Sequence, residues 1–208
     1  FLRLAPAFYY LQYVSGLIFG ENPSGIAFFV PILGVCLLPL LYLLFRRVHS
    51  PWESLGLMTL ASVSVYMVLY ARFAWNPNLL PFFLTLGFYA LLRAVALDEK
   101  HRTAWFLLAT FGLVLATEMH FLAFLAVPVI VAVFLILKRA HFSWQAWLGA
   151  LCIIVILSLP VVLNEIRTGG SNTSEFFCAI TEKSNKEQHN LIEKGIRDIS
   201  EFGLASVV

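Results

Sequence analysis

The chain is poor in charge. Only 12% of its 208 residues are Asp, Glu, Lys or Arg, whereas 60% are hydrophobic and the mean hydropathy is +0.84. Because soluble domains carry about 25% charged residues, this composition excludes an ordinary soluble domain and indicates a membrane protein. The formal net charge of +2 gives no reason to expect a nucleic-acid partner.

Motifs for several kinds of chemistry are missing as well. The three cysteines make no readable disulfide framework, since Cys36 and Cys152 lie inside apolar runs and Cys178 stands alone. The sequence has no nucleotide-binding glycine loop, zinc-ligand spacing or Ser/His/Asp arrangement. Residues 1–20 lack the pattern of a signal peptide. We interpret them as an interfacial or short juxtamembrane helix, and the start at Phe1 as a cut through a larger protein.

What the chain has instead is six apolar segments. Most are about 17–21 residues long, which suits a hydrocarbon core of about 30 Å. They predict an all-α fold, a polytopic bundle of about six transmembrane helices at residues 25–45, 53–71, 78–97, 103–118, 121–137 and 144–164.

The basic residues orient these segments. Lys and Arg gather after the first, third and fifth segments, near residues 46–49, 93–102 and 138–141. The positive-inside rule places these connections in the cytoplasm. The remaining connections then share the outer face with residues 1–24; they are residues 72–78, 118–120 and 164–173.

The turn between the fourth and fifth segments carries Glu118 and His120. Residues 103–137 would be about 52 Å long as one helix, so they are predicted to form two short helices. Each would have only about 16 residues, fewer than a full span prefers, so the turn is expected below the outer surface. Ionisable groups at that depth usually face a cavity or each other. The alternative is a shallow turn whose polar groups reach interfacial water.

Residues 72–78 form a polar interruption between two apolar runs. Arg72 carries the planar guanidinium that suits phosphate. Pro77 predicts a helix start with Asn76 as its cap, and Asn78 would lie in the first turn, where backbone N–H groups can face an anion. A plain Trp/Arg interfacial anchor remains the alternative.

The composition changes after Arg167. Residues 175–208 are predicted to form an outer-face amphipathic segment, because Leu191, Ile192, Ile196, Ile199 and Phe202 recur at helical spacing. Such a helix either lies on the membrane surface or packs as a solvated helix on neighbouring segments. The predicted division is therefore a membrane core at residues 1–174 and this segment.

Several stretches together resemble a known family. Residues 72–83, RFAWNPNLLPFF, are similar to the signature of bacterial relatives of the dolichyl-phosphate-mannose protein mannosyltransferases, which are membrane glycosyltransferases of the GT-C type. Four weaker matches lie in the same order as in that family: PAFYY at 6–10, FGENP at 19–23, EMHF at 118–121 and PVVLNEIRTG at 160–169. The resemblance covers about residues 1–175.

The resemblance implies an enzyme that takes a sugar from a polyprenyl-phosphate-linked donor and transfers it to an acceptor at the outer face. It implies a bacterial inner-membrane protein with a periplasmic or extracellular active face. Arg72, Asn76 and Asn78 would bind the donor, with Arg3 and Tyr10 as further candidates. Such enzymes often hold a divalent metal nearby, for which Glu118 and His120 are candidates. The family's general base would precede Phe1, so this chain alone is expected to be inactive.

Two other functions remain open on the sequence. A transporter or flippase could use Arg72, Glu118 and His120 for an anionic or proton-coupled substrate, although the inverted repeats of many transporters are not found. A structural membrane subunit would use the same residues only as anchors. Alanine substitution separates these functions, because anchors should tolerate it and site residues should not.

Overall fold

The computed structural model describes residues 6–171, 173–175 and 178, and all regular structure within them is helical. The helices follow the chain as α1 (Ala7–Phe19), α2 (Pro23–Ala27), α3 (Phe29–Phe45), α4 (Pro51–Ser62), α5 (Val65–Tyr70), the 3-10 helix η1 (Asn76–Leu79), α6 (Leu80–Ala94), α7 (Arg102–Met119), α8 (Phe121–Leu137) and α9 (Trp144–Arg167). The all-α prediction is confirmed. Arg3 and the segment predicted at residues 175–208, Glu175 and Cys178 excepted, lie outside the described residues.

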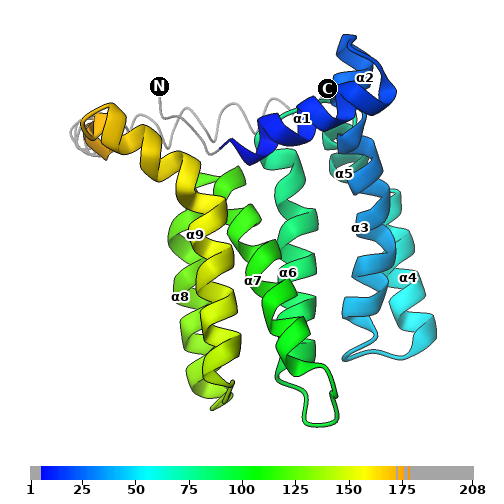
Figure 1. Ribbon diagram of the computed structural model, residues 1–208. Helices are drawn as coiled ribbons and strands as arrows, with labels where there is room; N and C mark the ends of the chain where they lie inside the picture. Colours follow the sequence, from blue (N-terminus) through cyan, green and yellow to red (C-terminus); the bar gives the residue numbers. More distant parts are fainter. Residues whose placement is uncertain (1–5, 172, 176–177, 179–208) are drawn as a thin grey trace, which may run out of the picture. The chain divides into compact units, whose positions relative to one another are not determined.

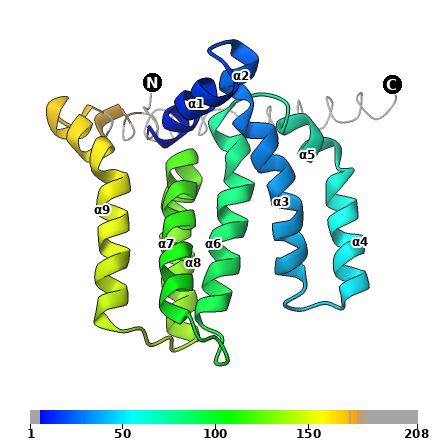
Figure 2. The same ribbon diagram turned by 45° about the vertical axis from the view of Figure 1, so that its right-hand side comes forward.

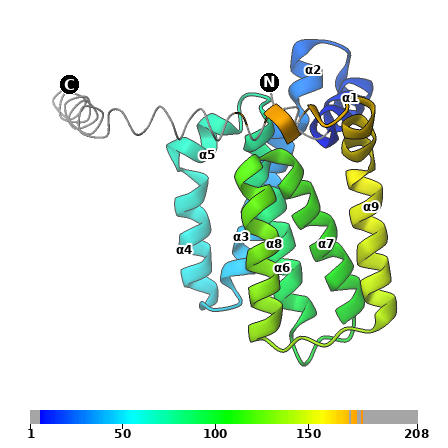
Figure 3. The same ribbon diagram turned by 90° about the vertical axis from the view of Figure 1, so that its left-hand side faces the viewer.

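The chain divides into two compact units, residues 4–161 and residues 1–3 with 162–208. In the first unit, α3, α4, α6, α7 and α8 run beside one another (Figures 1, 2 and 3). The connections at 46–50, 95–101 and 138–143 lie at one end, while α1, α2, α5 and η1 lie at the other. The three basic loops therefore share one end of the bundle, as the charge pattern requires of them.

Two stretches are long and apolar enough to cross a membrane by themselves, Pro23–Phe45 and Trp144–Arg167, and α8 is a shorter apolar helix. The predicted segments at 103–118 and 121–137 coincide closely with α7 and α8. The prediction of about six spans is met only in part, because length and hydropathy single out two spans among the described residues.

The segment predicted at 53–71 is not one helix. It begins as α4, with a reciprocal cap in which Ser50 and Glu53 bond each other's backbone N–H groups. It then breaks after Ser62 and resumes as the six-residue α5. The hydroxyls of Thr59 and Ser62 bond backbone carbonyls of their own helix, at Leu55 and Thr59. Such bonds and the following β-branched residues weaken the helical ladder, which apolar composition alone did not reveal.

The core of the first unit lies between α6 and α7. A Cβ on Gly87 would come within 2.5 Å of the Leu113 side chain, and one on Gly112 within 3.2 Å of the Gly87 backbone. Small residues of this kind let two helices approach closely in a membrane. Phe106, Ala109 and other buried residues continue this core toward α8 and the start of α9.

In the second unit, the last turns of α9 end in a glycine pair. Gly169 and Gly170 have φ values of 63° and 83°, in the left-handed region that glycine adopts without a steric penalty. The carboxylate of Glu165 accepts a hydrogen bond of 2.8 Å from the backbone N–H of Thr173. The boundary at 174/175 expected from composition stays a prediction.

Candidate functional site

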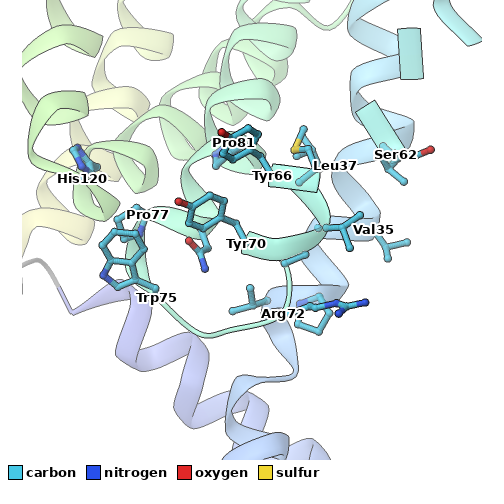
Figure 4. A pocket seen from close by; sticks show the side chains of 18 residues that line it. Val35, Leu37, Ser62, Tyr66, Tyr70, Arg72, Trp75, Pro77, Pro81 and His120 are labelled. Carbon is cyan, nitrogen blue, oxygen red and sulfur yellow. The ribbon is translucent and has the colours of Figure 1, made fainter. Parts of the chain in front are cut away.

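A cavity with a volume of about 650 Å³ lies at the predicted site. Its walls come from α3, the end of α4, α5, the 71–75 loop, η1, the start of α6 and the turn before α8. Figure 4 shows its lining side chains. Eighteen residues line it: Val30, Pro31, Gly34, Val35, Leu37, Leu38, Ser62, Tyr66, Met67, Val68, Tyr70, Ala71, Arg72, Trp75, Pro77, Asn78, Pro81 and His120.

The break between α4 and α5 shapes this cavity. Because α5 starts afresh at Val65, it does not continue the line of α4 but bends toward α3 (Figure 2). A Cβ on Gly34 of α3 would lie 3.1 Å from the Cβ of Ala71, so the absence of a side chain there permits the close approach. The same break turns Tyr66 and Tyr70 toward the cavity.

Arg72 lies at the end of the cavity next to α3, and Figure 4 shows it far from His120, with Tyr70 between them. Its side chain is exposed, and within the described residues its guanidinium makes no hydrogen bond or ion pair. The cavity lining contains no Asp or Glu. A lone, unpaired guanidinium in such a lining favours an anionic ligand.

Asn76 and Asn78 do not have the surroundings that the sequence predicted for them. Asn76 does not cap the helix: Trp75 occupies the N-cap position, and Asn76 is buried inside η1 with 8% of its surface exposed. Asn78 does line the cavity, but its side-chain amide donates to the Phe73 carbonyl at 2.8 Å and its backbone N–H donates to Trp75 at 3.0 Å. That backbone N–H is thus not available to an anion, because the tight 3-10 turn uses it. The side chain of Asn78 thus holds the loop that precedes η1.

His120 is half-buried and lines the opposite end of the cavity. It also caps α8, since its Nδ1 accepts a hydrogen bond of 3.1 Å from the backbone N–H of Leu122. A neutral imidazole whose Nδ1 accepts carries its proton on Nε2. His120 can therefore offer an N–H donor to a ligand while it holds the start of α8.

Glu118 does not line the cavity. It is buried, with 8% of its surface exposed, and its carboxylate faces the backbone amide of Ala7 at the start of α1. Its Oε1 has no hydrogen-bond partner. The helical backbone of α7 and the turn after it direct Glu118 and His120 to different elements. A site that uses both residues stays a prediction.

Tyr10, a further predicted residue, is not brought to the cavity. Tyr10 lies on α1 with 59% of its surface exposed and is absent from the cavity lining, and Arg3 lies outside the described residues. Sequence reasoning missed Tyr66 and Tyr70. Their signal was their spacing of four just before Arg72, which places them on one face of a helix.

The described residues do not fit a metal ion. Glu118 faces α1, and the Nδ1 of His120 is engaged by Leu122, which leaves the proton on Nε2. Across the part of the chain that the structure describes, no three His, Cys, Asp or Glu side chains come together as a ligand set. Two ligands directed to different elements do not form a metal site.

The sequence model of the dolichyl-phosphate-mannose-protein mannosyltransferase family matches residues 4–163. No curated protein and no solved structure matches the chain. The matched region includes every residue that lines the cavity and covers well over half of the 208 residues. The chain therefore belongs to the dolichyl-phosphate-mannose-protein mannosyltransferase family, which are membrane glycosyltransferases of the GT-C type.

Proposed function

We propose that this chain binds a polyprenyl-phosphate-linked sugar in the cavity beside Arg72 and forms part of an enzyme that transfers the sugar to an acceptor on the outer face of the membrane. Family membership implies the transferase activity and the class of donor. The observation that carries the proposal is a single arginine in the lining of a largely apolar cavity, without a partner among the described residues.

The apolar part of the cavity suits the lipid tail. Its α3 wall consists of apolar residues from Val30 to Leu38, with Gly34 leaving room where α3 and Ala71 approach each other. Transfer of hydrocarbon into such a wall is favourable, and a chain in a lipid-facing groove can remain partly in the bilayer. The tail would therefore lie along α3 with its phosphate at the polar end.

The polar part of the cavity suits the phosphate and the sugar. The guanidinium of Arg72 can donate two parallel hydrogen bonds to phosphate oxygens. Tyr70 and Trp75 present aromatic rings that give an apolar face to a sugar, and the Nε2–H of His120 can donate to a sugar or phosphate oxygen. The separation of Arg72 and His120 leaves room for a headgroup between them (Figure 4).

The proposed role of Arg72 follows from the electron balance of the reaction. The bond between the anomeric carbon and the phosphate oxygen breaks, and the phosphate leaves with the electron pair. The acceptor oxygen forms the new bond to carbon and gives up its proton to a base, which is not assigned among the described residues. Arg72 would stabilise the negative charge that grows on the leaving phosphate.

The test is sugar transfer by the complete protein in liposomes, with a polyprenyl-phosphate sugar as the donor and the products followed by mass spectrometry. Arg72→Ala is expected to raise the apparent KM for the donor or to abolish transfer. The matched control is Arg47→Ala, which removes an exposed arginine at the other end of the bundle. Full activity of a folded Arg72→Ala protein would return Arg72 to the role of an interfacial anchor.

His120 needs a variant that keeps its capping role. Asn caps helices well, so His120→Asn should preserve the start of α8 while removing the imidazole donor. We expect normal thermal stability and reduced transfer for this variant. Equal transfer by His120→Asn and the wild type would show that the cavity end at His120 contributes no donor to the reaction.

A further inference from the structure

Helix α1 begins without a cap of its own. Pro6 occupies the N-cap position and makes no side-chain cap hydrogen bond, and the first turn contains no acidic residue. The carbonyl of Pro6 accepts from the backbone N–H of Tyr10. The N–H groups of residues 7–9 precede the first intrahelical bond, so they need an acceptor from elsewhere.

Glu118 is the acceptor that faces this turn. Its carboxylate is directed at the backbone amide of Ala7, and Phe8 beside it is buried with Ala116 and Met119 of α7. The start of a helix carries a partial positive charge, which offsets part of the cost of burying a carboxylate. The unpartnered Oε1 leaves capacity for a second amide of the same turn.

We infer that Glu118 is a positioning residue that holds the start of α1 against the end of α7, by capping a helix that cannot cap itself. The neighbouring His120 does the same for α8 from the other side of the turn. One three-residue stretch thus fixes the starts of two helices. The cluster under α1 contains Val30, which also lines the cavity, so the position of α1 bears on the cavity wall.

Hydrogen–deuterium exchange of the amides at residues 7–9 in the complete protein measures this contact directly. A hydrogen bond to a charged group is worth enough that its loss should speed exchange of these amides about tenfold or more. We expect this in Glu118→Leu, with Glu118→Gln in between because its amide oxygen still accepts. Glu21→Gln, which changes an exposed carboxylate after α1, should leave their exchange unchanged.

A second substitution keeps the test decisive if Glu118→Leu folds poorly. Pro6→Asp gives α1 a side-chain cap of its own, so it should restore slow exchange and folding when added to Glu118→Leu. Rescue by this cap supports the inference, because a general packing defect at Glu118 would not respond to it. Failure of Pro6→Asp to restore slow exchange would overturn the inference.

A chelator separates this role from metal binding. If Glu118 capped α1, EDTA would leave the exchange of residues 7–9 in the wild type unchanged. If Glu118 held a metal ion, EDTA would speed their exchange in the wild type as much as Glu118→Leu does, and the capping inference would be wrong. Neither readout depends on sugar transfer, so failure of this inference is distinguishable from failure of the proposed function.

Discussion

The pair α6 and α7 and the group α3, α4 and α5 differ in how they are held. In the pair, Gly87 and Gly112 bring two backbones into contact, and a cluster of fully buried residues surrounds them. In the group, α4 and α5 are separated by a break and expose large apolar residues such as Leu60, Val65 and Tyr66. We infer that the tightly packed pair serves as scaffold, while the loosely packed group forms the cavity.

The two regions also differ in how the arginine near the end of each is bonded. At the loop after α6, Arg93 bonds the carboxylate of Glu99 and the hydroxyl of Tyr89, and its guanidinium lies 4.7 Å from the centre of the Trp105 ring. At the other end, the guanidinium of Arg72 has no partner within the described residues. Arg93 therefore stabilises the structure, whereas Arg72 is available to bind a ligand.

A substitution that pushes α6 and α7 apart should have the largest effect on the free energy of unfolding. Gly87→Leu would force a side chain into the Leu113 contact, and overpacking of this kind should cost about 3 kcal/mol or more of unfolding free energy. We expect the detergent-solubilised protein to lose its folded peak in size-exclusion chromatography and to unfold at a much lower temperature.

The control for the Gly87 substitution lies in α4, within the loosely packed group. A Cβ on Gly56 of α4 meets nothing within 4 Å, and leucine favours a helix by up to about 1 kcal/mol over glycine. Gly56→Leu should therefore leave the unfolding temperature unchanged or raise it slightly. Equal losses at the two glycines would contradict the contrast between scaffold and cavity side.

A side chain that fills the cavity should have the next largest effect. It should weaken donor binding and leave the fold intact. Gly34→Leu would press on Ala71 and occupy space beside Val35, where the lipid tail is proposed to lie. We expect a loss of donor binding of tenfold or more with a small change in unfolding temperature, measured by titration with a polyprenyl phosphate. Unchanged binding in a folded Gly34→Leu protein would show that the donor lies elsewhere.

The smallest expected effect concerns the loop after α6. Hydrogen bonds from Arg93 hold the pKa of Glu99 below its ordinary value of 4.5. A lowered pKa in the folded state stabilises the fold above the ordinary value, and this stabilisation is lost as the pH falls through the folded pKa. The difference in unfolding temperature between the wild type and Glu99→Gln should therefore be largest near neutral pH and shrink below about pH 4.5. A difference that grows on acidification would contradict the assignment.

Much of the fold could be predicted from hydrophobic patterning. The ranges of α7, α8 and α9 follow from apolar length and from the charges at their ends, because these are local properties of the sequence. The break after Ser62 was missed, since it depends on side-chain hydroxyls that bond the backbone within an apolar run. The close contact of Gly87 and Gly112 was missed because it joins residues 25 positions apart.

The candidate site could be predicted only in part. Arg72 and His120 do line one cavity, and the polar interruptions of apolar runs singled them out. Asn76 and Glu118 carry equally suitable chemistry but are directed elsewhere, to η1 and to the start of α1. Side-chain direction depends on how the helices pack, and residue type and spacing do not determine that packing.

Direct binding of a polyprenyl phosphate to the purified complete protein tests, without requiring catalysis, whether Arg72 holds the donor phosphate. Loss of a charge-assisted contact costs roughly 1.5–3 kcal/mol, so Arg72→Ala should weaken the affinity about 10- to 150-fold and Arg47→Ala should leave it unchanged. An unchanged affinity in Arg72→Ala, or an equal loss in both variants, would show that Arg72 does not hold the phosphate.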